Sequence, residues 1–283
     1  MSNLKGLTPI TDHSNLANVF YSQANEVLIS DLINKLHYSG IPINSIYGDS
    51  GCGQFKFVID RSDSIEFCDN ITLLKLISKK VADDNDLTFS FMAKFLTELL
   101  GNRFNLKFTI TNLEGKPASD NVINQALAGV LNHTLDFICF YAPNVNSYKR
   151  FFDNDLLDNW NKLGSSNDIQ GINLLKDKKE NKINFLLPGA DANPYLSLFS
   201  IVESVRLGVQ NKLDIKEAEN KVSHHNLPTS LFKAVKHFKN SQVARESIGD
   251  VYHEHFGIFN THEYESFNGQ ISHWELERYL YSI

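Results

Sequence analysis

Residues 185–213 read FLLPGADANPYLSLFSIVESVRLGVQNKL, and this stretch decides the fold. Its apolar start predicts the end of a strand, which the dipeptide Pro188-Gly189 terminates. Asp191 or Asn193 can cap the helix that follows, and Pro194 stands where a first-turn proline is tolerated. Apolar residues then recur at helical spacing, at Leu198, Ile201, Val202, Val205, Leu207 and Val209. We therefore expect a strand that runs directly into a capped and buried helix.

The rest of the chain mixes the two kinds of periodicity without strict alternation of strand and helix. Apolar residues at helical spacing predict helices from 22 to 40, from a cap at Asp69 to 81, from 121 to 140 and within 227–280. Alternating residues predict strands at 54–60, 87–91, 104–111 and 181–187, with an extended segment near 46–47. Residues 144–180 are polar and predict a long loop. The pattern favours one α+β domain, an antiparallel sheet with helices on one side.

Composition excludes several classes of function. The 283 residues are 42% hydrophobic, which supports a core, and carry a net charge of −6, which argues against a nucleic-acid partner. No segment approaches the length of apolar chain that spans a membrane. The three cysteines have no metal-like spacing, and the start of the chain has no apolar signal segment, so we expect a cytoplasmic protein.

Several short segments follow one another in an order that is typical of a known family. They are Gly53-Gln54, Asp69-Asn70, Phe91-Met92-x-Lys94, NSYKR at 146–150, PGADANPYL at 188–196, and Trp274-Glu275-x-Glu277-Arg278-Tyr279-Leu280. In content and order they resemble the catalytic domain of the glutamine synthetase family over roughly residues 15–283. The resemblance implies a curved antiparallel β-sheet packed by helices, of the glutamine synthetase/guanido kinase type. We expect an irregular lead-in at 1–20 and this domain at 21–283, without the family's smaller N-terminal domain.

The resemblance also implies where metal ions should bind, and most of those positions have changed. In the family, the first two glutamates that bind metal ions lie before the region of resemblance. The next two, seven residues apart around Gly53-Gln54, correspond to Asp49 and Lys56. The metal histidine corresponds to Leu106 and a nucleotide-side histidine to Phe108, while a further metal glutamate corresponds to Asn184. A charged lysine has no lone pair for a metal. We therefore expect no metal site.

The residues that handle substrate charge have changed in the same way. By the resemblance, three family arginines correspond to Asp168, Asn173 and Leu186. A catalytic glutamate on a flap corresponds to Leu156, with Asp155 beside it. The candidate remnants of a substrate site are Arg150, which in the family meets the amino-acid carboxylate, and Gly101-Asn102, part of a backbone loop.

Other motifs give weaker signals. His253, His255 and His262 superficially resemble a metal cluster, but helical residues two apart do not share a face. Phosphate loops, dinucleotide-binding motifs and the serine elbow of hydrolases are missing.

These observations predict a pseudoenzyme of the glutamine synthetase family with a binding, regulatory or scaffold role. The alternative is an ATP-dependent glutamate–ammonia or γ-glutamyl–amine ligase, with a remodelled site or one completed by another chain. ATP and Mg²⁺ are expected as cofactors only under that alternative. The expected partners are a second copy or another glutamine synthetase-like chain, in an assembly smaller than the family's dodecamer.

A buried lysine at a former metal position requires a partner for its charge. We expect Lys56 to pair with Asp49, with Leu106 and Phe108 closing the floor of the site. The alternative is a lysine whose ammonium reaches solvent.

Overall fold

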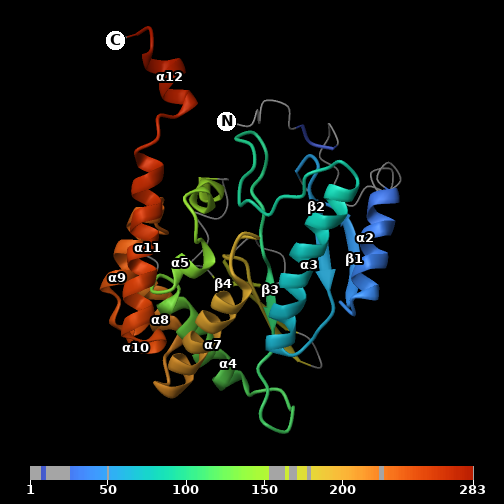
Figure 1. Ribbon diagram of the computed structural model, residues 1–283. Helices are drawn as coiled ribbons and strands as arrows, with labels where there is room; N and C mark the ends of the chain where they lie inside the picture. Colours follow the sequence, from blue (N-terminus) through green and yellow to red (C-terminus); the bar gives the residue numbers. More distant parts are fainter. Residues whose placement is uncertain are drawn as a thin grey trace. The chain divides into compact units, whose positions relative to one another are not determined.

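The computed structural model describes residues 8–10, 26–49, 51–152, 163–165, 171–176, 180–222 and 226–282. The chain divides into two compact units, Met1–Asn102 and Arg103–Ile283. Figure 1 shows helices together with small sheets, which confirms the predicted α+β class.

The first unit is a β-hairpin with two helices. It contains α2 (Glu26–Tyr38), β1 (Ile43–Gly48), β2 (Phe55–Ile59) and α3 (Ser64–Asp84). Strands β1 and β2 pair antiparallel, with Gly48 opposite Phe55 and Tyr47 opposite Lys56. Gly40 ends the α2 segment at φ 75°, a left-handed conformation that glycine adopts without strain. The core of this unit consists of Leu28, Leu32, Leu36, Ile41, Leu74 and Val81.

Residues 87–91 do not form the strand that their pattern predicted. Their aromatic side chains join a cluster instead, because the Phe89 ring lies 5.8 Å from that of Phe57 and 5.4 Å from that of Phe91. The apolar alternation thus reflects packing onto β2 without backbone pairing.

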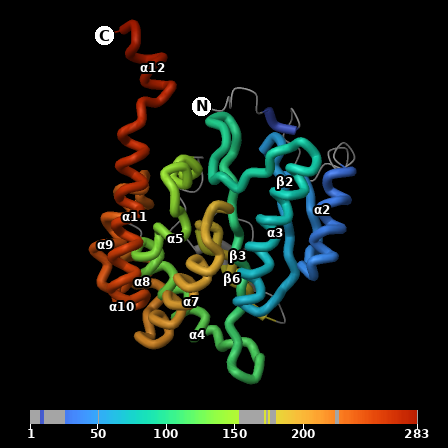
Figure 2. The backbone as a smooth tube through the Cα atoms, in the orientation of Figure 1, coloured from blue at the N-terminus to red at the C-terminus, as the bar shows by residue number. Residues whose placement is uncertain are grey.

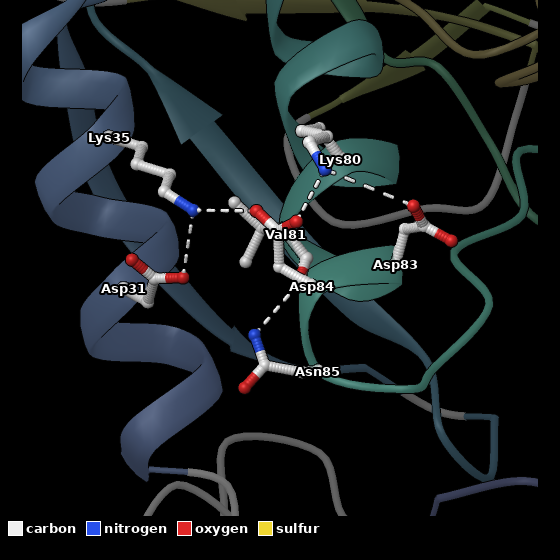
Figure 3. A network of polar contacts seen from close by, with 7 residues as sticks. All are labelled: Asp31, Lys35, Lys80, Val81, Asp83, Asp84 and Asn85. Atoms are coloured by element: carbon white, nitrogen blue, oxygen red, sulfur yellow. Dashed lines mark hydrogen bonds and ion pairs between the residues drawn. The ribbon is translucent and has the colours of Figure 1, made fainter.

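A polar network fastens α2 to α3 on the surface of this unit (Figure 3). The Lys35 ammonium lies 3.2 Å from the Asp31 carboxylate and 3.1 Å from that of Asp84. Lys80 contacts the other oxygen of Asp84, and its hydrogen bond is the main reason that the pKa of Asp84 is lowered. Exposed pairs of this kind contribute little stability, so we read the network as orienting the two helices.

The second unit holds a sheet in the order β3-β6-β5-β4. Its strands are β3 (Leu106–Phe108), β4 (Leu163–Ser165), β5 (Ile172–Lys176) and β6 (Asn181–Phe185). Pairs β3–β6 and β5–β6 are antiparallel, whereas β4–β5 is parallel. The helices are α4 (Asp120–His133), α5 (Ile138–Tyr141), the 3₁₀ helix η2 (Asn146–Phe152), α7 (Pro194–Gln210), α8 (Ile215–Val222), α9 (Leu231–Asn240), α10 (Gln242–Ile248), α11 (Asp250–Asn268) and α12 (His273–Tyr279).

Helix α7 is the predicted central helix, and Asn193 caps it by accepting hydrogen bonds from the backbone of Tyr195 and Leu196. Its buried face differs from the expected one. The buried residues are mainly small ones, Ser197, Ser200, Ser204 and Gly208 with Ile201, whereas Val202 is 54% exposed. Small side chains are needed because α4 packs very closely along this face.

Three further expectations were wrong. Helix α3 begins at Ser64 after Asp63, so Asp69 lies inside the helix and does not cap it. The apolar run at 121–140 is split into α4 and α5, where the Thr134 hydroxyl donates to the carbonyl of Val130. The expected loop at 144–180 contains η2, β4 and β5, whose polar residues hid the pattern. The proposed boundary at residues 20–21 stays a prediction.

Figure 2 shows the C-terminal segment ending in α12, apart from the other helices of its unit. Every residue from Glu265 to Ser282 is exposed. Among the described residues, no helix is long and apolar enough to cross a membrane.

Candidate functional site

The register of β3 on β6 divides the sheet of the second unit into two different faces. Leu106 lies opposite Phe185 and Phe108 opposite Ile183, so these side chains share one face. Ile172 of β5 joins them opposite Phe185, and most of this face is buried. The other face carries polar residues, because Lys107 lies opposite Asn184.

This register corrects part of the predicted site. Leu106 and Asn184 were both expected at metal positions, yet they point to opposite faces of the sheet. They therefore cannot surround one metal ion. On β3, Lys107 shares the Asn184 face, and Asn105, which immediately precedes the strand, falls on the same face by alternation. We therefore assign the face of interest to Asn105, Lys107 and Asn184, one residue away from the expected positions on β3.

The side-chain oxygens of the two asparagines on this face make no hydrogen bonds within the described residues. The Oδ1 atoms of Asn105 and Asn184 are buried, and neither accepts a hydrogen bond from a described residue. Lys107 is exposed, and its ammonium forms no ion pair with any residue that the structure describes. The face therefore presents one uncompensated positive charge beside two amides.

The structure describes only part of the three positions at which the resemblance implies arginine. Leu186 is buried, and its backbone N–H donates to the carbonyl of Gly171 at 2.9 Å. Asn173 lies opposite Asn184 in β5, but its side chain is outside the description. Asp168 and the flap residues Asp155 and Leu156 also lie outside the described residues.

Arg150 has an intramolecular role in this structure. Its side chain is fully buried, its Nη2 donates to the carbonyl oxygen of Leu187, and its guanidinium lies 4.6 Å from the centroid of the Phe151 ring. The candidate remnant of a carboxylate site is thus occupied in holding the 3₁₀ helix η2 against the end of β6. Its role toward a substrate stays a prediction.

The two segments that carry most of the resemblance pack against each other around Asp191. This carboxylate accepts hydrogen bonds from the Ser147 hydroxyl at 2.5 Å and from the Asn144 amide at 3.0 Å. A Cβ atom at Gly189 would lie 2.2 Å from the Asp191 carboxylate and 3.2 Å from Nε of Arg150. A side chain at position 189 would therefore displace the Asp191 carboxylate, and residues of both motifs contribute to the packing at this junction.

Buried hydroxyl and thiol groups near this junction are poor nucleophiles. Burial raises the pKa of the Cys139 thiol to about 12 and that of the Tyr148 hydroxyl well above its usual value. Both groups stay neutral at physiological pH, so neither supplies an activated nucleophile.

In the first unit, Lys56 differs from the expectation. Its ammonium lies 5.8 Å from the centroid of the Tyr47 ring, the residue opposite it in the hairpin. The contact is a cation–π interaction rather than the expected ion pair with Asp49. The backbone N–H of Asp49 donates to the carbonyl of Gln54 at 2.9 Å, which closes the glycine loop.

The other residues that were predicted as candidate site residues make contacts within the protein. The backbone and side-chain N–H groups of Asn102 donate to the carbonyls of Ala93 and Met92, which shapes the predicted Gly101-Asn102 loop. His253 is buried with Nε2 at 2.7 Å from the Phe238 carbonyl, whereas His255 is exposed. Among the described residues, no group of three or more His, Cys, Asp or Glu could hold a metal ion.

The fold matches that of solved structures. A structure titled apo GmaS without ligand superimposes with a TM-score of 0.81 at 20% identity, over 99% of this chain and 68% of that chain. A GmaS/ADP complex gives 0.82 at 19% identity, over 96% and 68%. At these identities the comparison establishes the fold, that of a glutamine synthetase-type catalytic domain.

A family model described as glutamine synthetase, catalytic domain, matches residues 7–279, and the chain belongs to this family. It is 29% identical to type-1 glutamine synthetase 2 of Dictyostelium discoideum, over 98% of this chain and 57% of that protein. It is 26% identical to γ-glutamylethanolamide synthetase GlnA4 of Streptomyces coelicolor and 25% identical to glutamate–isopropylamine ligase of a Pseudomonas species. Each of these two alignments covers 98% of this chain. They cover 62% of the length of the Streptomyces protein and 64% of the length of the Pseudomonas protein, so this chain spans less than two thirds of either relative.

The residues at the expected metal positions do not fit a divalent cation. Mg²⁺ prefers carboxylate and other oxygen ligands. The charged Lys56 offers no lone pair, the Leu106 side chain has no polar atom, and Asn184 offers a neutral amide where the resemblance implies a carboxylate. Asp49 is the remaining carboxylate of the expected set.

Proposed function

We propose that this chain is a non-catalytic member of the glutamine synthetase family, with a binding, regulatory or scaffold role. The observation that carries the proposal is the register pair Lys107–Asn184, which puts an ammonium and a neutral amide on the polar face of the sheet. An ammonium there repels a divalent cation, and the amide does not compensate for it.

The expected catalytic deficit is large. Phosphoryl transfer depends on metal ions and cationic groups that stabilise charge as it develops. Removing a single such group typically costs about 10²–10³ in rate. Several positions have changed together here, so we expect no useful transfer from ATP to glutamate.

The retained motifs are consistent with selection for the fold alone. Arg150, Asp191 and Gly189 are each used in the packing of η2 against the turn after β6. A domain that only binds a partner would keep these residues for stability.

Partner binding is supported by the exposed C-terminal segment. Trp274, Leu276 and Leu280 of α12 and its end are 60%, 45% and 60% exposed. Apolar side chains at this density on one short helix favour contact with another chain. We propose a second copy or another glutamine synthetase-like chain as the partner, in an assembly smaller than twelve copies, in the cytoplasm.

The alternative function is a γ-glutamyl–amine ligase. It is favoured by the relatives, whose names include γ-glutamylethanolamide synthetase and glutamate–isopropylamine ligase. Such a ligase requires ATP and Mg²⁺, and it requires carboxylates supplied by a remodelled site or by another chain.

An activity assay separates the two functions. Phosphate release from Mg·ATP is measured with glutamate and, in turn, ammonia, ethanolamine or isopropylamine. We expect no amine-dependent release by protein whose folding is verified by circular dichroism. Release that Asp49→Ala abolishes would establish the ligase and overturn the proposal.

A further inference from the structure

The polar face of the β3–β6 pair carries a second lysine. Lys182 lies two residues before Asn184 in β6, so the side chains of both residues point to the same face as Lys107. The opposite face, with Leu106, Ile183 and Phe185, is buried in the core. One side of this pair of strands is therefore apolar, and the other side carries two ammonium groups.

Of the two ammonium groups on this face, that of Lys107 is uncompensated by any described residue. Among the described residues, Lys182 pairs with Glu180 at 3.4 Å, and Lys107 has no carboxylate partner. A net positive charge therefore remains, centred on Lys107. Lys107 lies opposite Asn184 in the strand register. Asn105, two residues before Lys107, lies diagonally across from Asn184.

The two amides add hydrogen-bond donors to this charge. Their Oδ1 atoms are buried and accept no hydrogen bond from a described residue. Their Nδ2 atoms, by contrast, do not belong to the buried polar atoms that lack a hydrogen-bond partner. Neither Nδ2 donates a hydrogen bond within the described residues, so the amide N–H groups are left available for a ligand. Ammonium and amide N–H groups together are the donors that phosphate and carboxylate oxygens accept.

We propose that this face, formed by Asn105, Lys107, Lys182 and Asn184, binds a phosphate- or carboxylate-bearing anion directly, without a metal ion. The inference rests on the proposed function, because it concerns the same sheet face. Lys107 supplies the charge that a divalent cation would otherwise supply, and it makes bound Mg²⁺ unnecessary for holding the anion. Charge-assisted hydrogen bonds of this kind are about twice as strong as neutral ones.

The test is calorimetric titration of the full chain in EDTA with pyrophosphate, ADP and glutamate in separate experiments. We expect at least one of these anions to bind. We expect Lys107→Met to weaken that binding about tenfold, the loss of one charge-assisted hydrogen bond. Lys107 is exposed, so this variant should keep its fold. Lys236→Met, which removes an exposed lysine of α9, is the matched control and should bind as the wild type does.

The outcomes separate the two proposals. Binding in EDTA that depends on Lys107 supports the inference, and the anion that binds identifies phosphate or carboxylate as the group recognised. If none of the three anions binds in EDTA, or if Lys107→Met binds as tightly as wild type, the inference is wrong while the non-catalytic function stands. Binding that requires Mg²⁺ also makes the inference wrong, whereas amine-dependent phosphate release is the result that overturns the non-catalytic function.

Discussion

Gly208 of α7 lies directly against Gly129 of α4. A Cβ atom at Gly208 would stand 2.7 Å from the Cα of Gly129 and 2.2 Å from the carbonyl oxygen of Gln125. A Cβ at Gly129 would stand 2.1 Å from the carbonyl oxygen of Ser204. The two helix backbones are thus in contact, and neither position has room for a methyl group.

Gly208→Ala should therefore destabilise the protein although alanine favours a helix. Because the obstructing atoms are backbone, the helices must move apart, and overpacking of this kind costs about 1–3 kcal/mol. We expect a lower urea midpoint. The control is Gly269→Ala, where the nearest atom is 3.5 Å away and the backbone is right-handed helical. Equal stability of the two variants would contradict the close packing.

Arg150→Met tests whether the buried guanidinium stabilises the fold. The change leaves the carbonyl of Leu187 without its donor in the interior, which costs roughly 1–3 kcal/mol. We expect a clear loss in the free energy of unfolding. Lys149→Met, which removes the adjacent exposed lysine, is the control and should change stability little. A variant at position 150 that unfolds like wild type would leave Arg150 free for a substrate role.

Glu203 should make stability depend on pH. Its hydrogen bond with Arg206, and then that with Ser247, lower the pKa of Glu203 below the ordinary value of 4.5. Because the folded pKa is the lower one, the stabilisation is present above pH 4.5 and is lost as the pH falls through the folded pKa. Glu203→Gln should lower the urea midpoint at pH 7, and the difference from wild type should shrink in acid. A difference that grows toward low pH would refute this.

Local sequence signals were sufficient for much of the fold. Gly40, Asn193 and Pro194 mark helix ends whose geometry depends on neighbouring residues only, and the structure confirms α2 and α7 there. The prediction of which face of α7 is buried was wrong, because the close contact with α4 leaves room for serine and glycine but not for valine. Strand β5 was missed, because its pairing with β6 is a long-range property.

The candidate site shows the same limit. The alternation in 104–111 was correctly read as two faces, but only the register on β6 reveals that Lys107 faces Asn184. A shift of one residue in a strand exchanges the two faces completely. The resemblance placed Leu106 on the site, and the pairing places it in the core.

The mass of the protein in solution tests the proposed partner. We expect light scattering to give one or a few copies and not twelve. Where more than one copy associates, Trp274→Ser should shift the mass toward a single chain, because this exposed ring would lie in the contact. Phe232→Ser, a change of an exposed aromatic residue in α9, is the control. A mass near twelve copies would contradict the proposal.

The most direct test of the central claim is calorimetric titration of ATP with and without Mg²⁺. We expect that Mg²⁺ does not increase the affinity for ATP, because the face with Lys107 and Asn184 does not hold a divalent cation. Tight binding that appears only with Mg²⁺, and that is lost in Asp49→Ala, would contradict this expectation and favour the ligase.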